Sequence, residues 1–221
     1  MPADHPARQL AWSLVIPVKV LARAKTRLAP LAGPHRAELA LAMAADTVAA
    51  GLACPAVAHV LVVTDDERAS VLLAGLGAVI APDRPGSGLN PALRHGAEVA
   101  AGRWPQAGVA AAAADLPALR PDELGRGLRA AASWPEAFVP DAAGTGTTLY
   151  TARPGVAFRP LFGPGSAGRH RAAGAAELTL PGVVSLRRDV DSAADLREAA
   201  ALGLGPRTAA LAAFLVPAQG A

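Results

Sequence analysis

The sequence has few of the residues that build covalent or aromatic sites. Cys54 is the single cysteine in 221 residues, which excludes an internal disulfide and any zinc cluster made of several cysteines. With three tryptophans, one tyrosine, four phenylalanines and scattered basic residues, the chain is poorly suited to the stacking platforms that bind nucleic acid. We therefore expect no nucleic-acid partner, and we expect Cys54 to lie in the core.

Long apolar runs are also missing. Pro, Gly, Asp or Arg interrupts each apolar stretch before it could span a bilayer, and residues 1–9 lack the basic-then-apolar order of a signal peptide. These absences predict a cytoplasmic protein with no membrane partner. The formal net charge of +3 favours a small anionic ligand, and a phosphorylated molecule suits this composition.

Apolar strands and helical stretches alternate along the first part of the chain. The expected strands cover residues 12–18, 57–64, 77–81 and 108–114. The expected helices cover residues 34–53, 91–101 and 121–132, and a further one follows the N-cap in Thr64-Asp65-Asp66. The first of these helices should bury Leu41, Ala45, Val48 and Leu52. This alternation predicts a doubly wound α/β fold with a mostly parallel sheet.

After residue 135, the predicted strands and helices no longer alternate. Strands are expected at residues 137–140 and 147–152, around the turn at residues 141–144, and again at residues 183–188. The sheet therefore gains antiparallel members, and residues 195–215 are helical with a break at 203–206. We expect one domain over residues 11–216, after a disordered or weakly ordered segment at residues 1–10.

A basic loop follows the first strand. Lys19, Arg23, Lys25 and Arg27 lie where the first strand of an open α/β sheet delivers its ligand loop, and cations there neutralise phosphate oxygens. The alternative is a basic surface helix with Lys25 and Arg27 in solvent. The loop lacks the glycine spacing of a Walker motif, so a P-loop kinase is not expected.

Carboxylates follow two other expected strands. Asp115 ends a fully apolar strand, and Asp189 and Asp191 are alternate residues of an extended segment that could face one Mg²⁺ ion. Asp115 could instead cap the helix at residue 121, although the intervening Leu-Pro makes it a poor cap. Asp191 or Ser192 could cap a helix beginning near residue 193, and this is compatible with metal binding.

Two glycine-rich segments complete the candidate site. Gly144-Thr-Gly-Thr-Thr148 and Phe162-Gly-Pro-Gly-Ser166 offer close backbone approach and hydroxyl donors to an anion, with a helix beginning at Gly165 or Ser166. Turns alone also produce such segments. Together they predict a pocket for a second phosphorylated substrate, and His170 either supports this loop or lies on the surface.

In order along the chain, these motifs resemble the phospholactate or phosphoenolpyruvate guanylyltransferases of deazaflavin coenzyme (factor 420) biosynthesis. The motifs that carry the resemblance are residues 17–28, Gly88-Leu-Asn-Pro-Ala-Leu93, Asp115-Leu-Pro117, Gly144-Thr-Gly-Thr-Thr-Leu149, Phe162-Gly-Pro-Gly-Ser166 and Asp189-Val-Asp191. The resemblance implies a single-domain, three-layer α/β sandwich of the nucleotide-diphospho-sugar transferase type. It implies an activity that joins GMP from GTP to phosphoenolpyruvate or 2-phospho-L-lactate and releases pyrophosphate.

The resemblance also implies roles for individual residues. The GTP phosphates would contact Lys19, Lys25 and Arg27, the nucleoside would contact Gly88 and Asn90, and the acid would contact Thr148, Gly163 and Ser166. Mg²⁺ would bind Asp115 and one or both of Asp189 and Asp191. Lys19, Lys25, Arg27 and Asp115 would then be the catalytic residues.

The sequence does not decide which of the two acids is the substrate, since phosphoenolpyruvate and phospholactate differ only in their carbon backbone. The alanine-rich composition, typical of a high-GC bacterium, favours phosphoenolpyruvate through the resemblance. Two alternatives remain: a nucleotidyltransferase for a sugar phosphate or molybdopterin, and a noncatalytic nucleotide-binding domain. A phosphate monoester is largely ionised at neutral pH, so the reaction requires no strong general base.

Overall fold

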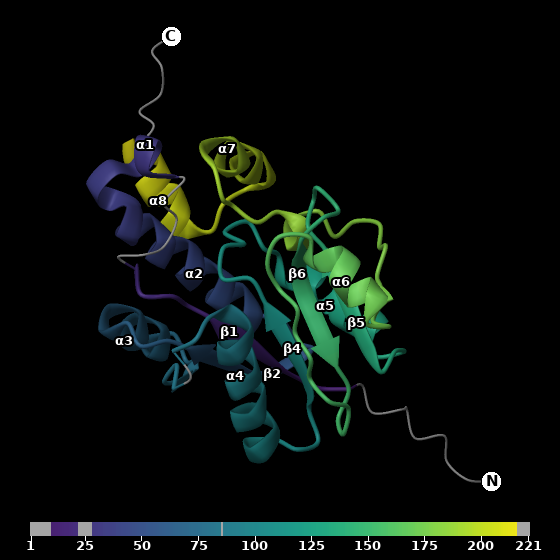
Figure 1. The fold of residues 1–221 in the computed structure, drawn as a ribbon. Helices are drawn as coiled ribbons and strands as arrows, with labels where there is room; N and C mark the ends of the chain where they lie inside the picture. Colours follow the sequence, from purple (N-terminus) through teal and green to yellow (C-terminus); the bar gives the residue numbers. More distant parts are fainter. Residues whose placement is uncertain (1–9, 22–27, 85, 216–221) are drawn as a thin grey trace, which may run out of the picture.

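A computed structural model describes residues 10–21, 28–84 and 86–215. Within these residues, one seven-stranded sheet has the order β3-β2-β1-β4-β6-β5-β7 (Figure 1). The strands are β1 (Trp12–Pro17), β2 (Val57–Val63), β3 (Val79–Ala81), β4 (Gly108–Ala112), β5 (Glu136–Pro140), β6 (Thr147–Ala152) and β7 (Ala176–Glu177). The four strands β3, β2, β1 and β4 are parallel, and β6 runs antiparallel to β4 and β5. This confirms the mostly parallel sheet with antiparallel additions.

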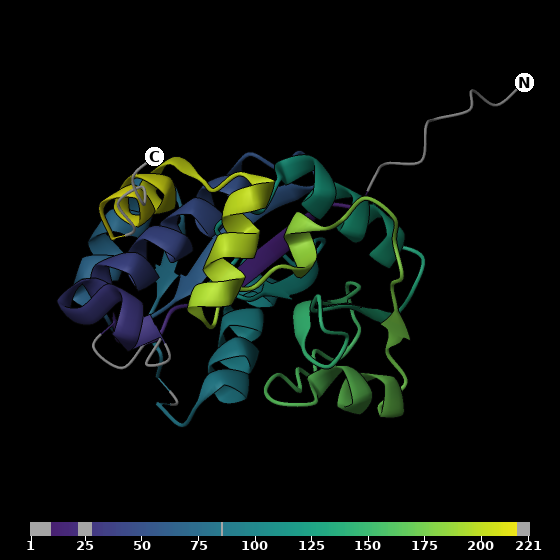
Figure 2. The ribbon, with the colours of Figure 1, turned by 90° about the horizontal axis from the view of Figure 1, so that it is seen from above.

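Helices cover both faces of the sheet, as the two views in Figures 1 and 2 show. The helices are α1 (Ala29–Ala32), α2 (Arg36–Leu52), α3 (Glu67–Gly75), α4 (Leu89–Arg103), α5 (Pro121–Ala131), α6 (Ser166–Ala172), α7 (Ala193–Leu202) and α8 (Pro206–Leu215). Side chains of α2, α3 and α5 share one apolar cluster with the sheet, and those of α4 and α6 share another. The fold is thus a three-layer sandwich, and α7 packs with α1 and α2 in a third cluster.

The sequence explains how closely these layers approach. Gly96 of α4 faces the sheet, where an added Cβ would lie 2.6 Å from methyl groups of both Val15 and Val63. Only a residue without a side chain allows α4 to pack this closely. Asp66 caps α3 by accepting a hydrogen bond from the Ala69 N–H, which confirms the expected N-cap.

Two predictions are wrong: the strand at residues 183–188 and the burial of Leu52. Residues 183–188 are not a strand, because Ser185–Arg187 form a short 3-10 helix, and this turn buries Leu186 together with Val183, two residues before the helix. The Glu123 carboxylate accepts a hydrogen bond from the Ser185 N–H and holds this turn against α5. Leu52, expected on the buried face of α2, is 38% exposed because it occupies the last turn.

Boundaries differ by a few residues elsewhere, and the two-residue strand β7 was not expected. Leu10 packs against the core, whereas residues 1–9 and residue 216 lie outside the described residues. Cys54 is buried as expected, and burial raises the pKa of its thiol. None of the helices in the described ranges is long and apolar enough to cross a membrane.

Candidate active site

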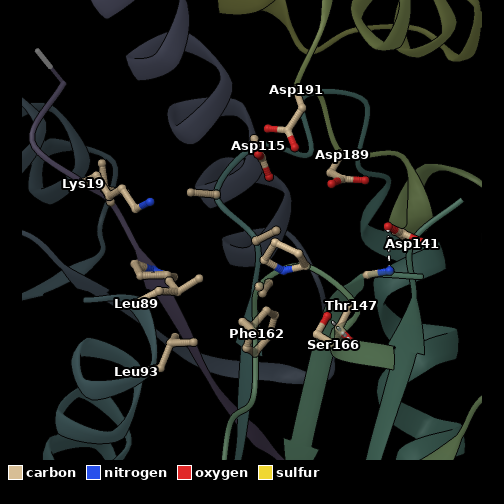
Figure 3. Close-up of a pocket in the computed structure, with 18 of the residues that line it drawn as sticks. Lys19, Leu89, Leu93, Asp115, Asp141, Thr147, Phe162, Ser166, Asp189 and Asp191 are labelled. Carbon is tan, nitrogen blue, oxygen red and sulfur yellow. Dashed lines mark hydrogen bonds between the residues drawn. The ribbon is translucent and has the colours of Figure 1, made fainter. Parts of the chain in front are cut away.

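A cleft of about 660 Å³ opens at the carboxyl ends of β1 and β4 (Figure 3). The chain places β2 and β3 on one side of β1 and β4 on the other, so the cleft lies where the strand order reverses. Ligands of open α/β sheets bind at this reversal. Residues from seven parts of the chain line the cleft, among them Lys19, Leu89, Asp115, Asp141, Thr147, Phe162, Gly163, Ser166, Asp189 and Asp191.

Carboxylates gather at one end of this cleft. Figure 3 shows Asp115, Asp189 and Asp191 close together, with Asp141 beside them. A backbone hydrogen bond of 3.0 Å from the Val190 N–H to the Asp115 carbonyl joins the two segments that carry them. The structure therefore brings together the three aspartates that the sequence had predicted as a group.

Asp189 is the most perturbed of these carboxyls. Burial, followed by the negative charge of Asp115 and smaller contributions from Asp191 and Asp141, raises its pKa to about 7. A carboxyl in this state gains from a nearby cation, which would offset the repulsion from the neighbouring carboxylates. Its surroundings are therefore suited to a bound metal ion.

The donor set consists of oxygens, which Mg²⁺ prefers. In the described ranges, no three His, Cys, Asp or Glu side chains are close enough to enclose a metal ion by themselves. Mg²⁺ is commonly held by one or two carboxylates together with substrate phosphates, so this end of the cleft suits an ion that arrives with a nucleotide. Ser192, with Asp195 in a capping box, caps α7 in place of Asp191.

The basic loop is described only in part. Lys19 is exposed and lies across the cleft from the carboxylates (Figure 3). The Asp66 carboxylate accepts a hydrogen bond of 3.0 Å from the Leu21 N–H and so anchors the loop to α3. Lys25 and Arg27 lie outside the described residues, and their roles stay predictions.

Asp141, which was not predicted as a site residue, lies in the wall of the cleft across from Lys19. Its two carboxylate oxygens accept hydrogen bonds from the Thr145 and Gly146 N–H groups, at 2.9 and 2.8 Å. An added Cβ at Gly146 would lie 2.3 Å from the Asp141 carboxylate, so only glycine fits there. The aspartate directly after a strand and before a glycine turn was the signal for this role in the sequence.

The structure places Thr147 in the cleft and turns Thr148 away from it. Thr147 contacts the Ser166 hydroxyl at 3.0 Å, and both line the cleft with Gly163. The Thr148 hydroxyl is buried and faces the Val139 carbonyl at 3.5 Å. An irregularity in the β5–β6 pairing, where Val139 pairs with Leu149 but Pro140 pairs with Thr147, decides which threonine faces the cleft.

Gly88 and Asn90 do not line the cleft. Gly88 precedes α4 with a φ of 115°, a backbone conformation that favours glycine. The Asn90 side chain accepts from the Phe162 N–H at 2.8 Å and donates to the Phe162 carbonyl at 3.0 Å. Asn90 thus holds the loop at residues 162–166 against α4, and the contact of Gly88 and Asn90 with a nucleoside stays a prediction.

The positions of the two threonines give a direct test. Thr147→Val should raise the KM for the acid that the resemblance implies about ten- to hundredfold, because losing a hydrogen bond to a charged group costs roughly 1.5–3 kcal/mol. Thr148→Val removes a hydroxyl outside the cleft and should change that KM by less than about twofold. Steady-state kinetics of both variants provide the measurement. A larger effect at Thr148 would contradict the placement of the two side chains.

Comparisons with known proteins identify relatives of this chain. A family model described as guanylyl transferase, CofC like, matches residues 12–208. A phosphoenolpyruvate guanylyltransferase from Thermomonospora curvata is 65% identical over 205 residues, covering 93% of this chain and 90% of the relative. One from Streptomyces coelicolor is 60% identical over 208 residues, covering 94% of this chain and 98% of the relative.

Solved structures share the fold. A protein from Desulfovibrio desulfuricans assigned to the nucleotide-diphospho-sugar transferases aligns with a TM-score of 0.60 at 20% identity, covering 86% of this chain and 96% of that one. A 4-diphosphocytidyl-2C-methyl-D-erythritol synthase aligns with a TM-score of 0.59 at 12% identity, covering 88% and 99%. The expected sandwich of the nucleotide-diphospho-sugar transferase type is therefore confirmed. By the family match and the identity to these relatives, the chain belongs to the CofC-like guanylyltransferase family.

Proposed function

We propose that this guanylyltransferase transfers GMP from GTP to the phosphate of phosphoenolpyruvate, with release of pyrophosphate, and that it requires Mg²⁺. The observation that carries the proposal is the cleft itself, in which a group of carboxylates and Lys19 lie beside a wall of hydroxyls and glycines. The relatives named phosphoenolpyruvate guanylyltransferase support the choice of acid. The product would serve deazaflavin coenzyme (factor 420) biosynthesis.

In the proposed reaction, a phosphate oxygen of the acid attacks the α-phosphorus of GTP. The bond from that phosphorus to the bridging oxygen breaks in line, and pyrophosphate leaves with the bond's electron pair. Lys19 lies where its ammonium can neutralise phosphate oxygens, a role also expected of Lys25 and Arg27. Mg²⁺, held by Asp115 with Asp189 or Asp191, would neutralise the charge that develops on the transferred group.

The walls of the cleft would orient the acid substrate. The segment at residues 145–147 and the loop at residues 163–166 lie side by side, because the Ala167 N–H donates to the Thr145 carbonyl. The acid bound there would present its phosphate toward the carboxylate end. Because the phosphate is already ionised, the cleft needs no histidine or cysteine as general base.

The proposal is tested by pyrophosphate release from GTP with Mg²⁺ and phosphoenolpyruvate. We expect release that depends on both the metal and the acid, and slower release with ATP or with 2-phospho-L-lactate. Equal rates with GTP and ATP would indicate a nucleotidyltransferase of broader specificity. No release with any acid would favour a noncatalytic nucleotide-binding protein and contradict the proposal.

A further inference from the structure

His170, on α6, lies enclosed behind the hydroxyl wall of the cleft. The residue is 1% exposed, and its ring stacks on Tyr150 with centroids 4.7 Å apart and planes 17° from parallel. Phe162 meets the ring edge-on at 5.6 Å. A second cavity of about 130 Å³ adjoins the ring, lined in part by Glu136 and Arg159. Side chains therefore do not pack against every side of the His170 ring, and the two hydrogen bonds that the ring makes set its orientation.

These hydrogen bonds define the tautomer of the ring. The Leu161 N–H donates to Nε2 of His170 at 2.9 Å, so Nε2 carries no hydrogen. The proton of the neutral ring is then on Nδ1, which lies 3.0 Å from Oγ1 of Thr147 and donates to it. Burial and, less strongly, the Arg169 cation lower the pKa of His170 to about 4 against the opposing charge of Glu136, so the ring is neutral near pH 7.

The direction of this bond determines what the cleft offers to a ligand. Thr147 Oγ1 accepts from His170 and also from the Ser166 hydroxyl, at 3.0 Å each. A hydroxyl oxygen has two lone pairs and one proton, so the Thr147 proton is left to donate. If the bond between the two hydroxyls reverses, Ser166 holds the spare proton instead. In both cases, the pair has one O–H for a ligand, and an anion is its strongest acceptor.

We propose that His170 is a positioning residue for the acid substrate: it ties the loop at residues 161–165 to the strand β6 and, by donating to Thr147, directs the remaining hydroxyl proton into the cleft. This inference rests on the proposed function for the identity of the acid. His170 itself does not line the cleft and acts through Thr147 and Leu161.

Kinetics of His170→Phe, Thr147→Val and the double variant test the proposal. Phenylalanine keeps the ring but removes both hydrogen bonds, so the KM for phosphoenolpyruvate should rise about three- to thirtyfold, with the KM for GTP and kcat within about twofold. Because His170 acts partly through Thr147, the KM for phosphoenolpyruvate in the double variant should rise by less than the product of the two single-variant rises. Additive effects, or equal rises for both substrates, would overturn the proposal.

His59→Phe is the matched control. His59 also stacks on an aromatic ring, that of Trp104 at 4.0 Å, but it lies in the first half of β2 and does not line the cleft. This variant should keep both KM values. Thermal unfolding of all variants separates a loss of acid affinity from a loss of folded protein.

The tautomer is measured on the wild-type protein, without turnover. Nitrogen-15 NMR of the histidine rings, with the His170 signals identified by their absence from His170→Gln, should show a neutral ring protonated on Nδ1 near pH 7. A proton on Nε2, or a charged ring, would overturn the proposal even if the enzyme is active. If the wild type does not turn over, the proposed function fails. The inference on His170 is then decided by this tautomer and by whether His170→Phe weakens phosphoenolpyruvate binding in an NMR titration.

Discussion

Asp189→Asn should make the metal-free protein more stable while it lowers Mg²⁺-dependent turnover. The pKa of Asp189 is raised from 3.8 to about 7, so between these values the folded protein keeps a proton that the unfolded chain has lost. Stability therefore falls as pH rises through this window, and the whole penalty is present above about pH 7. Asparagine carries no charge and removes a penalty on the order of 2–4 kcal/mol.

Urea unfolding without metal, at about pH 4 and about pH 8, measures this effect. The variant should match the wild type near the lower pH and exceed it at the higher one. Asp65→Asn is the control, because Asp65 is exposed and an amide oxygen can still accept the hydrogen bond from the Asp83 N–H. Equal unfolding free energies for wild type and Asp189→Asn at the higher pH would show that the ionised Asp189 carboxylate does not destabilise the fold.

Asp115→Asn should lower turnover by roughly a thousandfold or more, because a ligand that positions a charge-neutralising ion supplies several kcal/mol of transition-state stabilisation. The fold should persist. The substitution changes the side-chain volume little, and the Asp115 carbonyl still accepts from the Val190 N–H. Turnover at saturating GTP and acid, measured across a range of Mg²⁺ concentrations, checks this result.

The melting temperature of Asp115→Asn serves as the folding control. A folded variant whose activity returns at high Mg²⁺ would show weakened metal affinity and would still support the role of Asp115. Normal turnover at low Mg²⁺ would instead remove Asp115 from the metal site. The other carboxylates of the cleft would then have to hold the ion without it.

Local sequence patterns predicted most of the fold. The parallel strands and their covering helices follow from apolar periodicity, and the β5–β6 hairpin follows from its glycine-containing turn. Residues 183–188 misled the prediction because two apolar side chains three residues apart also fit a turn of 3-10 helix. Local patterns carry no information on which buried partner such a segment meets.

The sequence predicted some residues of the candidate site and missed others, again because local patterns carry no information on contacts between distant parts of the chain. Asp115 was found because it follows an apolar strand, and Asp189 because its segment reads as extended, although the strand expected before it is absent. The backbone hydrogen bond from Val190 to Asp115 joins their two segments. The choice of Thr147 over Thr148 depends on an irregular strand pairing, which no single-residue pattern specifies. The role of Asn90 depends on Phe162, 72 residues away, and such a contact exists only once the chain has folded.

The division of the cleft between two parts of the chain has a consequence for how such enzymes diversify. The carboxyl ends of β1 and β4 carry Lys19 and Asp115, whereas the hairpin at residues 136–152 and the α6 loop, with Asp141, Thr147 and Ser166, form a separate wall. That wall holds its own shape through bonds such as Asp141 to Thr145 and Ser166 to Thr147. Under the proposed function, mutations within this wall can therefore change which acceptor the enzyme recognises, while the residues that would hold the nucleotide and the metal stay unchanged.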